Sequence, residues 1–243
     1  MKKILFACDL DNTLIHSYKN KIDGDICIEI YNGNEQSFIS ARAVKLLKKI
    51  AEKILFIPVT TRSIEQYNRI NWIEGTTPNF AVVSNGANLL QNGNIDLKWK
   101  QDFYKNIRPY ENELQRQLKI LSQDKNFTIC RIVDGCFLFL KGGNDADIKK
   151  IAEEIQGGTN LAVEYFGRKI YLFPPKLNKG AALLKLKEIF KPVKIFAAGD
   201  SYIDIPMLNF ADFAFVHSNL NLNRNNFFEF DSADFLEYCL KII

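Results

Sequence analysis

Short apolar runs, each ending at polar turn residues, recur near both ends of the chain. They lie at residues 4–8, 54–59, 80–83, 193–198 and 213–216. Runs of this length and composition are typical of buried strands in a parallel sheet. The segments between them predict helices over about 41–52, 63–73, 179–190 and 232–241. Strand and helix therefore alternate, which predicts an α/β fold with a Rossmann-like parallel sheet.

The middle of the chain has a different pattern. The predicted elements are a long amphipathic helix over about 101–123, strands near 126–133 and 136–141, a helix near 145–156, and strands near 160–166 and 168–173. This α-β-β-α-β-β order predicts an inserted α+β module with an antiparallel sheet. The core domain is then discontinuous and comprises residues 1–87 and 174–243, with the inserted domain at 88–173.

Residues 16–39 interrupt the core between its first strand and its first helix. Ile26–Tyr31 alternates between apolar and polar positions, the Asn32-Gly33-Asn34 segment predicts a hairpin turn, and Ser37–Ile39 is the returning strand. Ser40 is the predicted N-cap of the helix that follows. We therefore expect an extra hairpin directly after the first strand.

The composition is that of an ordinary globular protein, with 47% hydrophobic and 25% charged residues in a chain of 243. No segment is long and apolar enough to span a membrane, and Asp9 ends the first apolar run too early for a signal peptide. The five cysteines include no CxxC pair and predict no zinc site. We expect a cytoplasmic protein with reduced thiols. The net charge of +4 is spread along the chain, so no nucleic-acid partner is expected.

Four aspartates lie at or just beyond the ends of predicted buried strands. Asp9 and Asp11 follow the first strand, and Asp200 and Asp204 follow the strand at 193–198. Ligands collect at the carboxyl ends of strands in an α/β sheet, so neighbouring parallel strands would bring these carboxylates together. Such a cluster repels itself unless a cation lies between its members, and a set of oxygen ligands favours Mg²⁺.

Two further residues supply what phosphoryl transfer needs. Thr60 follows the second strand and offers a hydroxyl and a backbone N–H to a phosphoryl oxygen. Lys179, at the predicted start of a helix, offers a positive charge. Phosphoryl transfer requires a group that attacks, a group that transfers a proton, and positive charge for the equatorial oxygens. The sequence therefore predicts a phosphoryl-transfer site.

The chain resembles the haloacid dehalogenase-like (HAD) hydrolases in four motifs that occur in order. They are Asp9-Leu10-Asp11-Asn12-Thr13, Val59-Thr60-Thr61-Arg62, Asn178-Lys179-Gly180-Ala181-Ala182-Leu183 and Gly199-Asp200-Ser201-Tyr202-Ile203-Asp204. The inserted module resembles the α/β cap of the Cof-type and sucrose-phosphate-phosphatase-like branch. The segment Ser84-Asn85-Gly86-Ala87 also looks like that branch.

The resemblance implies a role for each motif residue. Asp9 would attack phosphorus and carry the phosphoryl group, and Asp11 would protonate the leaving oxygen and then activate water. Thr60 and Lys179 would hold the phosphoryl oxygens. Thr61 would join them in binding the substrate.

The resemblance also implies a metal site and one open assignment. Asp9, the backbone carbonyl of Asp11, and Asp200 would bind Mg²⁺. Asp204 would bind the ion directly or orient its ligands. Arg62 is assigned to the substrate-binding set, with a structural ion pair as the open alternative.

The sequence as a whole predicts a Mg²⁺-dependent phosphatase. It would hydrolyse a small phosphorylated metabolite, a sugar phosphate on family resemblance, through an aspartyl-phosphate intermediate. The same motifs would serve a phosphotransferase or phosphomutase, or a regulatory protein that keeps the fold without turnover. Ile203 stands where Cof-type members usually carry asparagine, which leaves the subfamily open. His16 and His217 are expected to lie outside the catalytic set, and the oligomeric state is not predicted.

Overall fold

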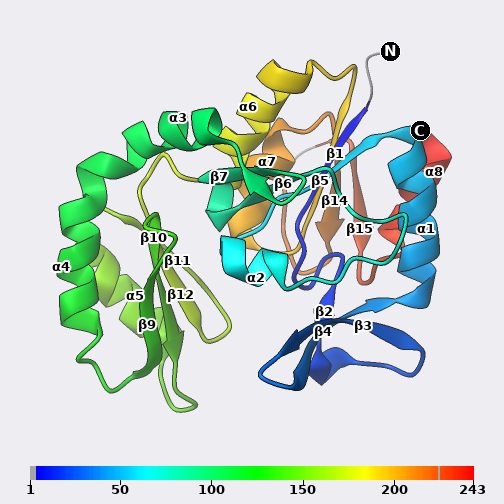
Figure 1. The fold of residues 1–243 in the computed structure, drawn as a ribbon. Coiled ribbons are helices and arrows are strands. Elements are labelled where there is room, and N and C mark those ends of the chain that lie inside the picture. The colour runs from blue at the N-terminus through cyan, green and yellow to red at the C-terminus, as the bar shows by residue number, and fades with distance from the viewer. Residues whose placement is uncertain (1–3, 224) are drawn as a thin grey trace. The chain divides into compact units, whose positions relative to one another are not determined.

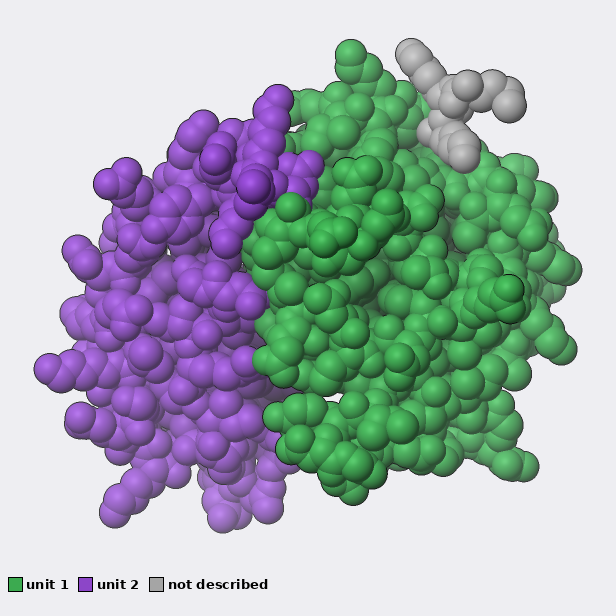
Figure 2. Space-filling model, in the orientation of Figure 1, with its two compact units in different colours: residues 1–95, 179–243 green, residues 96–178 purple. Residues whose placement is uncertain are grey.

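The structure, a computed structural model, describes residues 4–223 and 225–243 and divides into two compact units (Figure 1; Figure 2). Unit 1 comprises Met1–Ile95 and Lys179–Ile243, and unit 2 is the segment Asp96–Asn178. Both junctions lie later in the chain than the predicted ones at 87/88 and 173/174. The first is displaced because β7 (Asn88–Gln91) pairs with β6 (Phe80–Val83) and thus belongs to unit 1.

A parallel sheet forms the centre of unit 1, and it confirms the predicted α/β fold. Among the described residues, its five strands lie in the order β15-β14-β13-β1-β5. Their bounds are β1 Leu5–Cys8, β5 Leu55–Pro58, β13 Ile195–Gly199, β14 Phe213–His217 and β15 Phe227–Phe230. β15 was not predicted from the sequence. The central strand β1 pairs with β13 and β5, and its side chains are buried throughout, as its apolar run predicts.

The helices of unit 1 are α1 Ala41–Lys53, α2 Ile64–Asn68, α6 Lys179–Phe190, α7 Ile205–Phe210 and α8 Phe235–Ile242. Ser40 caps α1 as predicted, because its side chain accepts a hydrogen bond from the N–H of Ala43. The helix predicted over 63–73 is wrong in length. It ends early because the N–H of Asn71 donates to the carbonyl of Ile28, which draws the chain out of the helical path.

Two small antiparallel sheets complete unit 1. One has the order β6-β7-β8, with β8 at Asn94–Ile95. The other has the order β2-β4-β3, formed by β2 His16–Ser17, β3 Asp25–Tyr31 and β4 Asn34–Ser40. The turn between β3 and β4 carries Asn32 and Gly33 at φ 50° and 77°, the left-handed conformation that a tight hairpin turn requires. The predicted extra hairpin is therefore present, and we call it the β3–β4 hairpin.

Unit 2 has the predicted α-β-β-α-β-β order with one difference. Its elements are α3 Leu97–Ile107, α4 Glu111–Leu121, β9 Phe127–Val133, β10 Phe137–Gly142, α5 Ile148–Gly157, β11 Ala162–Phe166 and β12 Lys169–Phe173. The strands form an antiparallel sheet in the order β11-β12-β10-β9. The single helix predicted over 101–123 is wrong, since the 3-10 turn Arg108–Tyr110 separates α3 from α4. Pro109 explains the break, because proline lacks the N–H that a continuous helix uses.

Short 3-10 turns occupy Tyr18–Asn20, Ser84–Gly86 and Tyr202–Asp204 in unit 1. Across the part of the chain that the structure describes, every helix is too short or too polar to cross a membrane.

Candidate active site

The carboxyl ends of β1 and β13 bring two of the predicted carboxylates together. Cys8 of β1 pairs with Ala198 of β13, so Asp9 and Asp200 follow at the same edge of the sheet. The N–H of Asp9 donates to the carbonyl of Ala198 at 2.9 Å and extends this pairing. Oxygen atoms of Asp9, Asp200 and Asp204 all lie within 4.8 Å of one another. The predicted convergence of the first and fourth motifs is therefore seen for these three side chains.

The carboxylate of Asp204 is held in one orientation. It is fully buried, and its Oδ2 accepts hydrogen bonds from the N–H of Asp200 at 3.2 Å, the N–H of Ser201 at 3.0 Å and the Ser201 hydroxyl at 2.8 Å. Glycine at position 199 makes room for it, because a Cβ there would lie 2.4 Å from the Cβ of Asp204. The backbone around β13 thus fixes where the carboxylate points.

Lys179 lies between two of the carboxylates. It is the first residue of α6 and is 1% exposed, and its Nζ donates to Oδ1 of Asp9 at 2.5 Å and to Oδ1 of Asp204 at 2.6 Å. Burial acts to lower the pKa of the ammonium, but the charges of Asp204 and Asp9 outweigh it and raise the pKa above its ordinary value. Lys179 therefore carries its positive charge in the site.

Thr13 also belongs to this site, although no role was predicted for it from the sequence. Its hydroxyl lies 3.3 Å from Oδ2 of Asp9 and 3.3 Å from Oδ1 of Asp200. The turn that brings it there depends on Asn12, which has φ 63°, a conformation that asparagine tolerates better than most residues. Thr13 is the last residue of the first motif, and this position could have indicated that its side chain lies near Asp9.

The three clustered carboxylates carry more negative charge than the ammonium of Lys179 neutralises. Burial raises the pKa of Asp9 well above its ordinary value; Lys179 opposes this, and the charges of Asp204 and Asp200 add to it. Burial, followed by the charge of Asp204, raises the pKa of Asp200 to about 6. Three carboxylates face one ammonium, and oxygen atoms are the ligands that a hard divalent cation prefers. The donor set therefore fits Mg²⁺.

Asp11 contacts a second cation of unit 1. Its carboxylate pairs with Arg62, whose Nε donates to Oδ2 at 2.8 Å and whose Nη2 donates to Oδ1 at 2.8 Å. Such a two-point contact fixes both side chains in one plane. Arg62 is 8% exposed and also contacts Glu29 of β3, which was not among the predicted site residues.

Thr60 and Thr61 follow β5, and the outcome for Thr60 corrects one prediction. The backbone N–H of Thr60 donates to the carbonyl of Val82 at 2.9 Å, so it is already used within the protein. Its hydroxyl oxygen accepts from the N–H of Arg62 at 3.1 Å, which leaves the hydroxyl proton to donate. Thr61 is half-buried beside it.

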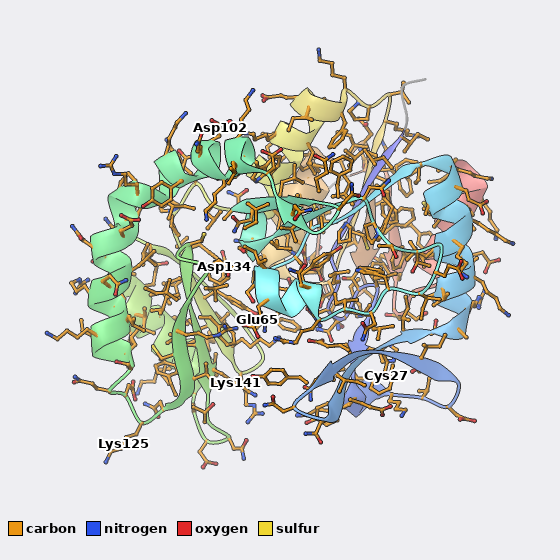
Figure 3. All side chains as sticks on the ribbon, in the orientation of Figure 1. Cys27, Glu65, Asp102, Lys125, Asp134 and Lys141 are labelled. Atoms are coloured by element: carbon orange, nitrogen blue, oxygen red, sulfur yellow. The ribbon has the colours of Figure 1, made fainter. Side chains whose placement is uncertain are left out.

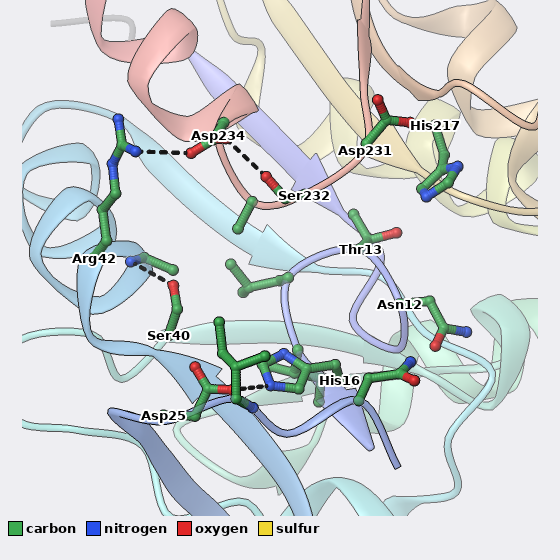
Figure 4. A pocket seen from close by; sticks show the side chains of 16 residues that line it. Asn12, Thr13, His16, Asp25, Ser40, Arg42, His217, Asp231, Ser232 and Asp234 are labelled. Carbon is green, nitrogen blue, oxygen red and sulfur yellow. Dashed lines mark hydrogen bonds and ion pairs between the residues drawn. The ribbon is translucent and has the colours of Figure 1, made fainter. Parts of the chain in front are cut away.

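A pocket of about 500 Å³ opens beside the loop that follows β1 (Figure 4). It is lined in part by Asn12 and Thr13 of that loop and by both histidines of the chain. His16 pairs with Asp25 at 2.6 Å, and neither His16 nor His217 contacts the clustered carboxylates in the interactions of the described residues. The histidines thus belong to the wall of this pocket.

The chain matches a known family over its second half. The pattern described as haloacid dehalogenase-like hydrolase matches residues 98–223, just over half of the chain. The chain therefore belongs to the haloacid dehalogenase-like hydrolases. No curated protein matches the sequence.

Solved structures share the fold at low sequence identity. The sucrose-phosphatase of Synechocystis sp., solved with sucrose and phosphate, has a TM-score of 0.69 at 16% identity over 99% of this chain and 98% of that one. A trehalose-6-phosphate phosphatase related protein has a TM-score of 0.59 at 18% identity over 98% and 96%. A phosphatase of the HAD superfamily from Bacteroides thetaiotaomicron has a TM-score of 0.57 at 15% identity over 99% and 95%. These likenesses show the fold of the whole chain.

Proposed function

We propose that the protein is a Mg²⁺-dependent phosphatase that hydrolyses a small phosphomonoester. The observation that carries this proposal is the position of Lys179, buried between Asp9 and Asp204 at the carboxyl edge of the parallel sheet. A buried ammonium beside a carboxylate supplies both positive charge for a phosphoryl group and a fixed orientation for the attacking oxygen. Membership of a hydrolase family supports the same reading.

Asp9 is the proposed nucleophile. A carboxylate oxygen of Asp9 forms a bond to phosphorus as the bond from phosphorus to the ester oxygen breaks. Asp11 gives a proton to the departing oxygen. In the second half of the reaction a water oxygen attacks phosphorus, its proton passes to Asp11, and the bond to Asp9 breaks to release phosphate. Both acid–base roles require that Asp11 be held at a defined place relative to Asp9.

Lys179 and the hydroxyl of Thr60 are the proposed contacts of the phosphoryl oxygens. Thr60 has a hydroxyl proton to donate, and Lys179 contributes charge from a side chain that is already oriented by two carboxylates. Neither group has to reorganise when negative charge develops on the oxygens, which is the condition under which such contacts accelerate a reaction most. Thr61 is proposed to join them.

Asp9, Asp200 and the backbone carbonyl of Asp11 are the proposed ligands of Mg²⁺. The ion, when bound, neutralises negative charge on the phosphoryl oxygens. Asp204 is proposed to orient Lys179 instead of binding the ion, because its Oδ2 already accepts three hydrogen bonds and its Oδ1 contacts Nζ of Lys179.

The substrate is proposed to be a small phosphorylated metabolite such as a sugar phosphate. The names of two structural neighbours, a sucrose-phosphatase and a trehalose-6-phosphate phosphatase related protein, support a sugar phosphate. Unit 2 is proposed to act as the cap that selects the leaving group.

Phosphate release from a panel of phosphomonoesters, with and without Mg²⁺, tests the proposal. The panel contains sugar phosphates, a nucleotide and p-nitrophenyl phosphate, and the Asp9→Asn variant is the matched control because it keeps the shape of the side chain. Release that needs Mg²⁺ and is lost in Asp9→Asn supports the proposal. Release that Asp9→Asn retains, or no release from any ester, would overturn it.

A further inference from the structure

Arg62 uses all of its N–H groups within the protein. A guanidinium has five such donors in a fixed plane. Nε and one Nη2 proton donate to Asp11, the second Nη2 proton donates to the Ser37 hydroxyl at 2.9 Å, and Nη1 donates to Glu29 at 2.8 Å and to the Gln66 carbonyl at 3.4 Å. A phosphoryl oxygen could therefore contact Arg62 only if one of these bonds were broken.

Two of the partners of Arg62 belong to the β3–β4 hairpin. Glu29 lies on β3 and Ser37 on β4, and the two residues are paired across the hairpin. Each is 4% exposed, and the Ser37 hydroxyl donates to Oε2 of Glu29 at 2.6 Å. The hairpin that interrupts the core after β1 thus contributes a buried carboxylate and a hydroxyl to the side chain that holds Asp11.

Glu29 also contacts a second arginine, Arg69. Nε of Arg69 donates to Oε1 of Glu29 at 3.1 Å, and its Nη1 donates to Oε1 of Glu65 on α2 at 2.9 Å. The guanidinium of Arg69 also lies over the ring of Tyr31, 4.5 Å from its centre. Glu29 is therefore fixed by Ser37 of β4 and by two arginines, Arg62 before α2 and Arg69 after it.

The charge balance explains why the hairpin residue matters to Arg62. Burial acts to lower the pKa of Arg62, but the charge of Asp11 and then that of Glu29 outweigh it and raise the pKa above its ordinary value. A buried guanidinium with one of two carboxylates removed is left partly uncompensated and moves to find another partner. The most exposed of its contacts is Asp11, whose side chain is 40% exposed against 5% for Glu29.

We propose that Glu29 is a positioning residue for the reaction: it aims Arg62 so that the guanidinium fixes the place of the Asp11 carboxyl group. In the ion pair both oxygens of Asp11 accept from Arg62, so one of them leaves the pair and takes a proton from solvent before it gives that proton to the leaving group. This inference rests on the proposed function, since it assigns a task to Asp11 in that reaction. It also gives the β3–β4 hairpin a catalytic purpose and makes Arg62 a link between hairpin and acid instead of a substrate contact.

The proton transfer supplies a readout that a merely structural role would not move. A good leaving group such as p-nitrophenolate departs with little help from a general acid, whereas an alkoxide needs the proton. The ratio kcat/KM reports the steps up to the first irreversible one, which includes departure of the leaving group. A displaced Asp11 therefore lowers kcat/KM for an alkyl phosphate far more than for p-nitrophenyl phosphate.

The experiment compares Glu29→Gln with the wild-type protein on both esters. We expect kcat/KM for the alkyl phosphate to fall about 10- to 100-fold, and that for p-nitrophenyl phosphate to fall by less than about 3-fold. The control is Glu65→Gln, which removes the other carboxylate that contacts Arg69 but does not reach Arg62. Glu65 lies on α2 with its side chain 74% exposed, so both ratios should match those of the wild type (Figure 3).

Equal decreases in kcat/KM for the two esters, or no decrease for either, would overturn the inference. Turnover by the wild-type protein would in that case still support the proposed function. A wild-type protein that hydrolyses neither ester would instead overturn the proposed function. Ser37→Ala keeps the test valid if Glu29→Gln does not fold, because it removes one Arg62 contact without removing a charge. It should lower the alkyl phosphate ratio in the same direction by about 3- to 10-fold, and an unchanged ratio would contradict the inference.

Discussion

Two buried cations in unit 1 are held in the same way but by different parts of the chain. Lys179 lies between Asp9 and Asp204, and Arg62 lies between Asp11 and Glu29. In each case one of the two carboxylates, Asp9 or Asp11, comes from the first motif. The second, Asp204 or Glu29, comes from another part of the chain and keeps the cation in place. The lysine offers a compact charge and the arginine offers a planar fork, so the first suits a phosphoryl group and the second suits a carboxylate that must keep its orientation.

The difference between the two lies in where the second carboxylate comes from. Asp204 follows β13, a neighbour of β1 in the parallel sheet, so the fold of the core alone places it. Glu29 comes from the β3–β4 hairpin, which belongs to a separate small sheet. The charge that we propose assists phosphoryl transfer is thus placed by the core, and the proposed orientation of the acid depends on the hairpin.

The same difference explains how much the sequence could predict. Asp9, Asp200 and Lys179 were predictable because parallel strands end at one edge of a sheet and α6 begins with Lys179. The contact between Glu29 and Arg62 was not, because the register of β3 on β4 shifts next to Glu29 and alternation cannot reveal which face it occupies.

The fold was predictable to a similar degree. Buried parallel strands can be recognised as apolar runs in the sequence, and Ser40 correctly indicates the start of α1. The break at Pro109 carried a signal that the amphipathic pattern around it masked. The sequence contains no local signal for the end of α2, because that end depends on a hydrogen bond from Asn71 to Ile28 of the hairpin.

The largest effect is expected from Asp9, the proposed nucleophile. Asp9→Asn should lower kcat more than about 10³-fold, since an amide oxygen is a far weaker nucleophile than a carboxylate. The fold should persist, because the cluster carries excess negative charge and the substitution removes part of it. Activity and the thermal midpoint are measured on the same sample. A variant that retains turnover, or one that loses its cooperative unfolding, would contradict this.

Removal of the metal should follow in size. A chelator should abolish turnover and added Mg²⁺ should restore it. Mg²⁺ at a hundred times its Kd should stabilise the wild-type fold by about 2.7 kcal/mol, and Asp200→Asn should lose most of that stabilisation. The matched control is Asp23→Asn, an exposed residue in the loop before β3. Equal stabilisation of all three proteins by Mg²⁺ would place the ion elsewhere.

A smaller effect is expected from a methyl group placed against Asp204. Gly199→Ala forces a shift, because its Cβ would lie 2.4 Å from that of Asp204, and we expect a loss of about 1–3 kcal/mol in the free energy of unfolding. The displaced carboxylate should release Lys179 and lower kcat about 10-fold or more. Gly157→Ala at the end of α5 is the control, since nothing lies within 4 Å of its Cβ. Similar results for the two variants would refute the role given to Asp204.

The smallest effect is expected at the histidine beside the hairpin. His16→Gln removes the contact to Asp25 of β3 but touches neither Arg62 nor Lys179. Turnover should stay within about 2-fold of the wild type and the free energy of unfolding should change by no more than about 1 kcal/mol. Steady-state kinetics on p-nitrophenyl phosphate and an alkyl phosphate decide this. A fall of more than about 10-fold would show that the pocket takes part in catalysis.

Capture of the phosphoryl enzyme tests whether Asp9 carries the phosphoryl group during turnover. Asp11→Asn retains the nucleophile but cannot activate water, so with p-nitrophenyl phosphate and Mg²⁺ it should accumulate the covalent intermediate. Acid quenching followed by mass spectrometry of the peptides locates the added group. We expect one phosphoryl group on Asp9, absent when Asp9→Asn is added. A phosphoryl group on another residue, or turnover by the wild type with Asp9 unmodified in every quenched sample, would contradict it.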